Sequence, residues 1–233
     1  MATRVANLTI GQQLPERKFE VAQADVLRYA AASGDFNPLH LDDAAAQSAG
    51  MQGAFAHGMF SAGCLATALT DALGVQSLTQ LAVRFRAQAW LGSTLTSEIV
   101  VADVRQDAER ALVHLDCNLR SGEAVAISGT AVAASSPPAR EPDDPVAPPA
   151  PSATSLLGKR LTPAVVCVEH GPVQFFATAV GDDSRVYRSA RAAQALGLVG
   201  IPVPPTFIFS RRIGELSPTI NRRRWRTAPP WPN

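Results

Sequence analysis

The sequence predicts an α+β protein in which an antiparallel sheet packs around one buried helix. The first observation is a segment at 57–73 that is apolar on nearly every face and rich in Gly and Ala, as an enclosed helix would be. The second is the strand-like alternation of residues from 78 to 134, interrupted by Leu-Gly and Ser-Gly turn signals. The third is a short strand at 18–21 followed by a helix with an apolar stripe at 24–33.

The composition excludes several classes of function. The 233 residues contain 21 Lys and Arg against 20 Asp and Glu, a balance that gives no electrostatic footprint for nucleic acid. The longest apolar run, 59–73, is too short and too polar to span a membrane. The first residues lack the apolar core of a signal peptide, so we expect a cytoplasmic protein. The cysteines have no CxxC spacing, which predicts buried thiols without a disulfide or zinc site: Cys64, Cys117 and Cys167.

The sequence contains an internal repeat with a constant offset of 147 residues and no gap. The offset places Gly34-Asp35 on Gly181-Asp182 and Phe60 on Phe207, and it holds further glycines in register. A segment dense in Pro, Ala and Ser separates the copies and predicts an extended linker. The predicted organisation is a first domain at 1–134, a linker at 135–154, a partial second copy at 155–210 and a basic, disordered tail at 211–233.

Chemistry is expected in the first copy alone. Asp35 and His40 are five residues apart with Asn37-Pro38 between them, which favours a loop that turns both side chains toward one point. A carboxylate and an imidazole that share one water form a general acid/base pair. Asn37 is expected to hold the loop through a bond from its side chain to the backbone. The alternative is a structural turn with a surface histidine.

A second candidate group, His57-Gly58-Met59, opens the buried helix. The first-turn N–H groups of a helix have no helical partner, and glycine lets a ligand approach the backbone closely. These donors suit an oxygen that gains negative charge during a reaction, such as a thioester carbonyl becoming an enolate. The alternative is helix packing that requires a small residue at Gly58.

These motifs carry a resemblance to a known family. Residues 29–42 (YAAASGDFNPLHLD) and 56–59 (AHGM) resemble the signature of the MaoC-like (R)-specific enoyl-CoA hydratases. The resemblance implies a hot-dog fold, as dimers or tandem double hot dogs with an acyl-thioester tunnel at the interface, and a place in fatty acid metabolism. It implies water activation by Asp35 and His40 and binding of the thioester oxygen by the Gly58 N–H. It gives supporting roles to Asn37, His57 and Met59.

The second copy resembles the non-catalytic half of tandem dehydratases. At the offset of 147, His40 becomes Tyr187, His57 becomes Pro204 and Gly58 becomes Pro205, which has no N–H to offer an oxyanion. Strand alternation is absent after Phe207. We therefore expect one active site per chain.

Three functions remain in competition. The leading hypothesis is a lyase that hydrates a trans-2-enoyl thioester of CoA or acyl carrier protein to the (R)-3-hydroxyacyl thioester, without a metal or other cofactor. The second is a non-catalytic thioester-binding or scaffold subunit completed by a partner chain, and the third is a hot-dog thioesterase. The expected partners are the thioester substrate and a second copy or a hot-dog partner chain, with no nucleic acid or membrane.

Other candidates weigh less. His114 is expected mid-strand, opposite the buried face, and His170 in a short structural turn. The arginines of residues 222–226 are expected in a solvated tail rather than on CoA phosphates or nucleic acid. A serine that some family members carry in the central helix has no clear counterpart, because Ala62, Cys64 and Ala66 occupy that stretch, so no chain-length preference is predicted.

Overall fold

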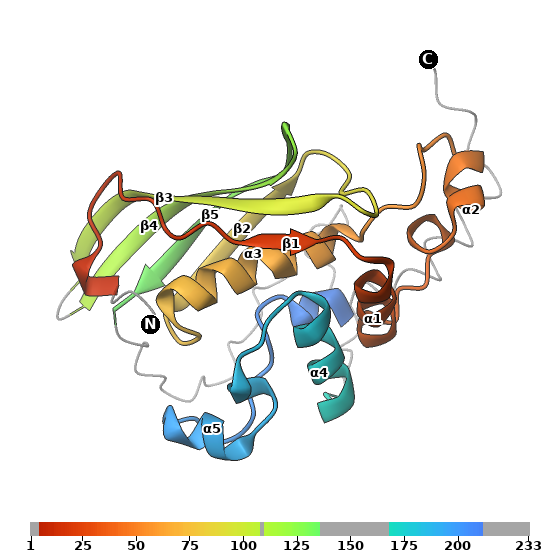
Figure 1. Ribbon diagram of the computed structural model, residues 1–233. Coiled ribbons are helices and arrows are strands. Elements are labelled where there is room, and N and C mark those ends of the chain that lie inside the picture. Colours follow the sequence, from red (N-terminus) through yellow and green to blue (C-terminus); the bar gives the residue numbers. More distant parts are fainter. Residues whose placement is uncertain (1–4, 108–109, 136–167, 212–233) are drawn as a thin grey trace, which may run out of the picture.

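The first copy folds as a five-stranded antiparallel sheet laid over one long helix (Figure 1). The computed structural model describes residues 5–107, 110–135 and 168–211. The strand order is β1-β3-β4-β5-β2, and the predicted α+β architecture is confirmed. The strands are β1 (Lys18–Glu20), β2 (Leu78–Phe85), β3 (Thr94–Asp107), β4 (Arg110–Ser121) and β5 (Ala124–Ala134).

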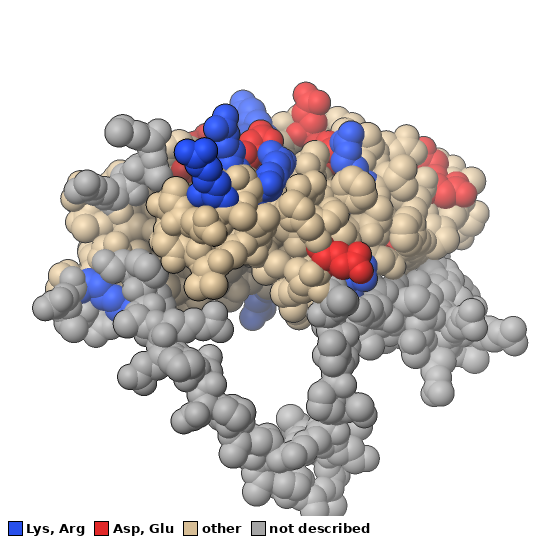
Figure 2. All heavy atoms as spheres, turned by 90° about the horizontal axis from the view of Figure 1, so that it is seen from below, with Lys and Arg blue, Asp and Glu red and all other residues tan. Residues whose placement is uncertain are grey.

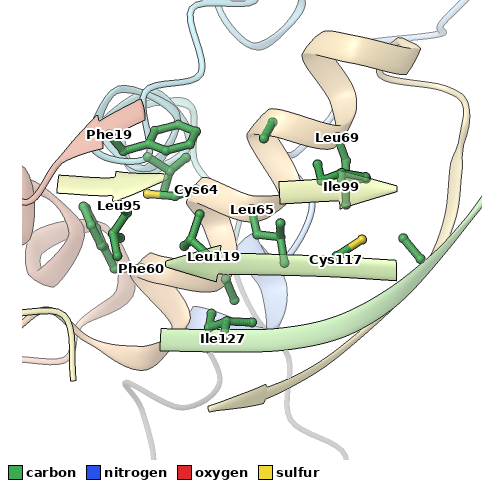
Figure 3. Packing of buried hydrophobic residues seen from close by; sticks show 14 of the residues in the cluster. Phe19, Phe60, Cys64, Leu65, Leu69, Leu95, Ile99, Cys117, Leu119 and Ile127 are labelled. Carbon is green, nitrogen blue, oxygen red and sulfur yellow. The ribbon is translucent and has the colours of Figure 1, made fainter. Parts of the chain in front are cut away.

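Helix α3 (Gly58–Leu73) forms the centre of the molecule. All of its residues except Gly58 and Asp71 are buried, which explains why its sequence is apolar all round. Its side chains meet those of β3, β4 and β5 in one core (Figure 3). The residues labelled there include Leu65 and Leu69 from α3, Leu95 and Ile99 from β3, Leu119 from β4 and Ile127 from β5.

The alternation of β4 places one face in this core. Val113, Leu115 and Cys117 are buried, whereas His114 between them is only half-buried on the opposite face, as its alternation predicts. Cys64 and Cys117 are both buried free thiols, in agreement with the sequence. Cys167 lies outside the described residues.

The helical elements of the second copy repeat those of the first in order and spacing. In the first copy, α1 (Gln23–Ser33) is followed by a 3₁₀ helix (Pro38–His40) and α2 (Asp43–Ser48). In the second, α4 (His170–Ala179) is followed by a 3₁₀ helix (Arg185–Tyr187) and α5 (Ala190–Ala195). Each begins 147 residues after its counterpart. Figure 1 shows α4 and α5 on the side of α3 that faces away from the sheet.

Equivalent glycines have the same backbone conformation in both copies. Gly34 and Gly181 have φ values of 82° and 68°, and Gly50 and Gly197 have φ values of 82° and 77°. These values lie in the left-handed region that glycine enters without steric cost. The glycines that recur at the offset of 147 therefore mark helix ends and turns in both copies.

The structure corrects two details and leaves others as predictions. His170 begins α4 rather than forming a separate turn, because Pro172 lies in the first helical turn, where proline is tolerated. Arg211, assigned to the tail, belongs to a helical segment at 207–211. The linker at 135–154, apart from Ser135, and residues 212–233 lie outside the described residues, so the domain boundaries stay predictions.

The charged side chains are distributed without a large patch of one sign on the face shown in Figure 2, where acidic and basic groups are interspersed among uncharged residues. This distribution agrees with the near-neutral composition. No helix within the described ranges combines the length and the apolar character that crossing a bilayer requires.

Candidate active site

The turn after α1 holds Asp35, the predicted catalytic carboxylate, in a half-buried position. Gly34 ends α1 in the left-handed conformation, and its N–H bonds to the Ala30 carbonyl. The Asn37 N–H then donates to Asp35 Oδ1 at 3.3 Å, and the Leu39 N–H donates to Asn37 Oδ1 at 3.1 Å. Two consecutive side-chain-to-backbone bonds therefore fold the segment back on itself.

The 3₁₀ helix that begins at Pro38 places the side chain of His40 close to that of Asp35. The His40 Nδ1–H donates to the Phe55 carbonyl at 2.8 Å, so the lone pair lies on Nε2. Burial lowers the pKa of His40 below its usual value, and this outweighs the opposing effects of the Phe55 carbonyl and Asp35. His40 is therefore a neutral imidazole near pH 7 with one nitrogen able to accept a proton.

His57 is more closely involved than its assigned supporting role implies. It is 3% exposed, and its Nε2–H donates to the Asp35 carbonyl at 2.9 Å. Its ring centroid lies 3.9 Å from that of His40 and 4.7 Å from that of Tyr29. Burial, reinforced by His40, lowers the pKa of His57 to about 4. The ring is neutral, and it links the Asp35 backbone to the start of α3.

Three of the predicted residues form one cluster. Asp35, His40 and His57 each offer a side-chain oxygen or nitrogen, and these atoms all lie within 4.8 Å of one another. Met59 does not join the cluster, because its buried side chain lines a separate groove along β2.

Gly58 is the first residue of α3, and a pocket of about 260 Å³ opens beside it. A Cβ at Gly58 would lie 3.1 Å from the ring of Phe85, so the packing explanation for this glycine has a physical basis alongside the functional one. The pocket is lined by residues of α3, β5 and the segments around 55 and 85–89, among them Phe55, Ser61, Phe85, Ala89 and Ile127.

Sequence reasoning missed four residues of this region. Phe55 orients His40, Tyr29 packs on His57, Phe85 covers Gly58, and the buried Ser61 lines the pocket. Ser61 alone had a sequence signal, because it follows Gly58 by three positions and therefore lies on the same helix face. The other contacts depend on tertiary packing.

In the second copy, the turn around Asp182, which is equivalent to the turn around Asp35, is buried. Asp182 is 1% exposed, and its Oδ1 accepts the Ser184 N–H at 3.0 Å. Its Oδ2 and the hydroxyl of the buried Tyr187 have no hydrogen-bond partner within the part of the chain that the structure describes. With Tyr187 in the place of His40 and Pro205 in the place of Gly58, this turn keeps the carboxylate but lacks the imidazole and the backbone N–H.

Arginines from each copy contact the helix end of the other. The Arg17 guanidinium pairs with Asp71 and donates to the Gly181 carbonyl at 2.5 Å, just beyond α4. The Arg211 Nη1 donates to the Ala32 carbonyl at 3.4 Å, three residues before Asp35. Cations suit helix C-termini because the unpaired carbonyls there carry negative partial charge. The second copy thus contacts the end of α1 that leads into Asp35 and the candidate site of the first.

Comparison with known proteins gives the family. Residues 5–119 match the family model described as a MaoC like domain, and residues 155–225 match a FAS1-like dehydratase domain region. The 3-hydroxybutyryl-CoA dehydratase of Methylorubrum extorquens is 30% identical over 133 residues, which cover 56% of this chain and 82% of that protein. The chain belongs to the MaoC-like dehydratase family. The (R)-specific enoyl-CoA hydratase of Aeromonas caviae, 31% identical over 128 residues, covers 54% of this chain and is itself covered to 94%.

Solved structures confirm the hot-dog fold of this MaoC-like protein. An (R)-hydratase from A. caviae aligns with a TM-score of 0.50 at 28% identity over 55% of this chain and 96% of that chain. A putative MaoC domain dehydratase from Chloroflexus aurantiacus aligns with a TM-score of 0.70 at 17% identity over 93% of this chain and 73% of that chain. The second likeness concerns the fold alone, and it extends across both copies.

Proposed function

We propose that this MaoC-like protein catalyses the reversible hydration of a trans-2-enoyl thioester, of CoA or acyl carrier protein, to the (R)-3-hydroxyacyl thioester. The observation that carries the proposal is the convergence of Asp35, His40 and His57 next to the start of α3. The names of the two relatives, a 3-hydroxybutyryl-CoA dehydratase and an (R)-specific enoyl-CoA hydratase, support the reaction class.

In hydration, His40 is the base. Its Nε2 takes a proton from a water that the Asp35 carboxylate orients, and the water oxygen forms a bond to C3 of the enoyl group. The π electrons move toward the thioester oxygen, which becomes an enolate. Return of the proton to C2 completes the addition and leaves both side chains in their initial state. Dehydration follows the same steps in reverse.

The start of α3 stabilises the enolate. The Gly58 N–H belongs to the first helical turn and faces no helical carbonyl, so it is available to the thioester oxygen. The positive end of the helix dipole acts in the same direction. His57 remains neutral because its pKa is about 4, and it holds the backbone of Asp35 through the bond to its carbonyl.

The decisive experiment measures hydration of crotonyl-CoA by purified variants. Asp35→Asn and His40→Gln are each expected to lower kcat by about 10²–10⁴-fold, because both act on the same water. His114→Gln, which changes a half-buried histidine of β4 outside the site, is the control and should keep full activity. Near-normal turnover by either site variant, with circular dichroism showing a folded chain, would contradict the assignment. Chiral analysis of the product tests the (R) configuration.

The binding-subunit alternative has one observation in its favour. An open, largely apolar groove of about 1230 Å³ runs along edge strand β2, opposite residues 198–209 of the second copy. Within the described chain β2 pairs with β5 alone, so its other edge is free to accept a strand from a partner. Native mass and activity of the isolated chain discriminate: an active homodimer supports the enzyme, and an inactive chain that gains activity with a hot-dog partner supports the subunit. Free acid in place of the hydroxyacyl thioester would indicate a thioesterase.

A further inference from the structure

We propose that Asp35, His40 and His57 also form a binding site for one divalent transition-metal ion, for which Zn²⁺ is the probe, and that the bound ion inhibits the enzyme. One side-chain donor atom of each residue lies within 4.8 Å of the other two. Nitrogen and oxygen ligands at 2.0–2.1 Å from a tetrahedral zinc are ~3.3 Å apart, so a small closure completes the site. His57 is the buried anchor, and the half-buried Asp35 and His40 rotate toward it.

Each imidazole donates one ring N–H to a backbone carbonyl, as metal-binding histidines do. Metal-binding histidines donate their second ring N–H to a carbonyl or carboxylate, which fixes the tautomer and the ring. The His40 Nδ1–H donates to the Phe55 carbonyl at 2.8 Å, and the His57 Nε2–H donates to the Asp35 carbonyl at 2.9 Å. The lone pairs therefore lie on His40 Nε2 and His57 Nδ1.

The second ring supplies an independent observation. His57 is 3% exposed, and its Nδ1 is buried without a hydrogen-bond partner among the described residues. A buried acceptor without a partner costs free energy, and coordination of a cation removes that cost.

The donor set indicates the class of ion. Two imidazoles and one carboxylate match the three-ligand sites of zinc and other first-row divalent ions, in which a fourth position stays open to water. The carboxylate of Asp35 offsets part of the ionic charge. Mg²⁺ and Ca²⁺, which prefer oxygen ligands, are expected to bind weakly.

The inhibition rests on the proposed function, whereas the binding does not. The ion coordinates His40 Nε2, the atom that accepts the proton of water, so the metal-bound chain has no free base. Removal of the ion restores the base and therefore the activity.

The experiment is a calorimetric titration of the EDTA-treated, dialysed chain with Zn²⁺. The wild-type chain is expected to bind one ion and to gain thermal stability, because a ligand of the folded state stabilises it. His40→Gln and His57→Gln are expected to lose both effects. The remaining histidines, His114 and His170, give matched controls: His114→Gln and His170→Gln should bind as the wild type does.

One further measurement keeps the proposal open to refutation. Co²⁺ should give the visible absorption of a four- or five-coordinate site in the wild type and lose it in His40→Gln, whose half-buried side chain can change without opening the core. Equal Zn²⁺ binding by wild type and His40→Gln would overturn the site.

Activity separates this proposal from the hydratase assignment. Zn²⁺ should abolish hydration of crotonyl-CoA, and EDTA should restore it. Full activity of the zinc-loaded chain would overturn the inhibition and leave the hydratase assignment standing. Zinc binding that depends on His40 and His57 in a chain inactive even after EDTA would refute the hydratase assignment and leave the metal site standing.

Discussion

The rings of Tyr29 and Phe176 pack against each other with centroids 5.6 Å apart, and the two residues occupy equivalent positions 147 residues apart in the two copies. Each also makes the same edge-to-face contact within its own copy. Tyr29 meets Phe60 at 5.9 Å and 86°, and Phe176 meets Phe207 at 5.4 Å and 87°. Phe207 is the counterpart of Phe60, so the copies pack through one self-complementary surface, as the subunits of a two-fold dimer do.

The contact between Phe176 and Tyr29 connects the second copy to the candidate site. Tyr29 packs on His57 with centroids 4.7 Å apart, and His57 packs on His40 at 3.9 Å. Phe176 of the second copy is therefore connected to His40 of the first through two intervening rings. A copy without counterparts of His40 and His57 thus packs against the candidate site.

Replacing Phe176 tests whether this packing supports the site. The side chain is fully buried, and Phe176→Ala is expected to lower the free energy of unfolding by about 3–5 kcal/mol. Under conditions where the variant remains folded, kcat for hydration should also fall, because Tyr29 and then His57 lose their support. Urea denaturation and steady-state kinetics measure the two effects. The neighbouring Phe175 is 54% exposed, so Phe175→Ala is the control and should change little. Equal effects of the two variants would refute the role of Phe176.

Close packing between the copies requires Gly63. A Cβ there would lie 2.5 Å from Val180 Cγ1, and overpacking of this kind costs about 1–3 kcal/mol. Gly63→Ala is expected to be destabilising despite the roughly 1 kcal/mol that alanine gains over glycine inside a helix. The free energy of unfolding should recover in Gly63→Ala/Val180→Ala. Gly171→Ala in α4 meets no atom within 4 Å and should be neutral or stabilising. No recovery in the double variant would show that Val180 is not the obstacle.

Gly58→Ala separates the two explanations for that glycine. Alanine retains the N–H but brings a Cβ to 3.1 Å from the ring of Phe85, beside the pocket. We expect kcat/KM to fall by about 10-fold or more, since small misplacements of a reacting group are costly. If the pocket itself must stay open for substrate, Phe85→Ala in the same chain will not restore the rate. Full restoration by Phe85→Ala would instead assign the glycine to packing.

Local features of the sequence were sufficient to predict the turn from Asp35 to His40 and the central helix. Gly34 allows the left-handed conformation that ends α1, and Pro38 restricts the backbone after Asp35, so a turn that ends at His40 follows from neighbouring residues. The all-apolar pattern of α3 follows from enclosure. The same local reasoning was wrong at His170, because Gly171 and Pro172 resemble a turn although proline fits the first turn of a helix.

The rest of the site depends on contacts between distant segments. The bond from His57 to the Asp35 carbonyl spans 22 residues, and that from His40 to the Phe55 carbonyl spans 15. The position of Phe85 over Gly58 depends on the placement of β2 beside α3. No periodicity encodes such pairings, so His57 could not be placed within the cluster from the sequence alone.

The buried turn around Asp182 in the second copy predicts a pH dependence of stability. Burial is the main cause that raises the pKa of Asp182 above its ordinary value, with Asp183 adding to it, whereas the Ser184 N–H, Arg17 and Arg188 oppose it. The folded state therefore holds this proton at pH values where the unfolded state, with a pKa of about 3.9, has released it. Stability is lost as pH rises from the unfolded pKa through the folded one, and the cost persists at higher pH.

Asp182→Asn removes the charge and keeps an oxygen to accept the Ser184 N–H, which bonds to Asp182 Oδ1 at 3.0 Å in the wild type. The thermal midpoint of Asp182→Asn should therefore exceed that of the wild type by an amount that grows between pH 4 and pH 8. Glu123→Gln is the control: that side chain is exposed in the turn between β4 and β5 and is not among the groups that shift the pKa of Asp182, so it should show no such growth. A midpoint difference for Asp182→Asn that stays constant or shrinks with rising pH would mean that this carboxyl group is charged in the folded chain without penalty.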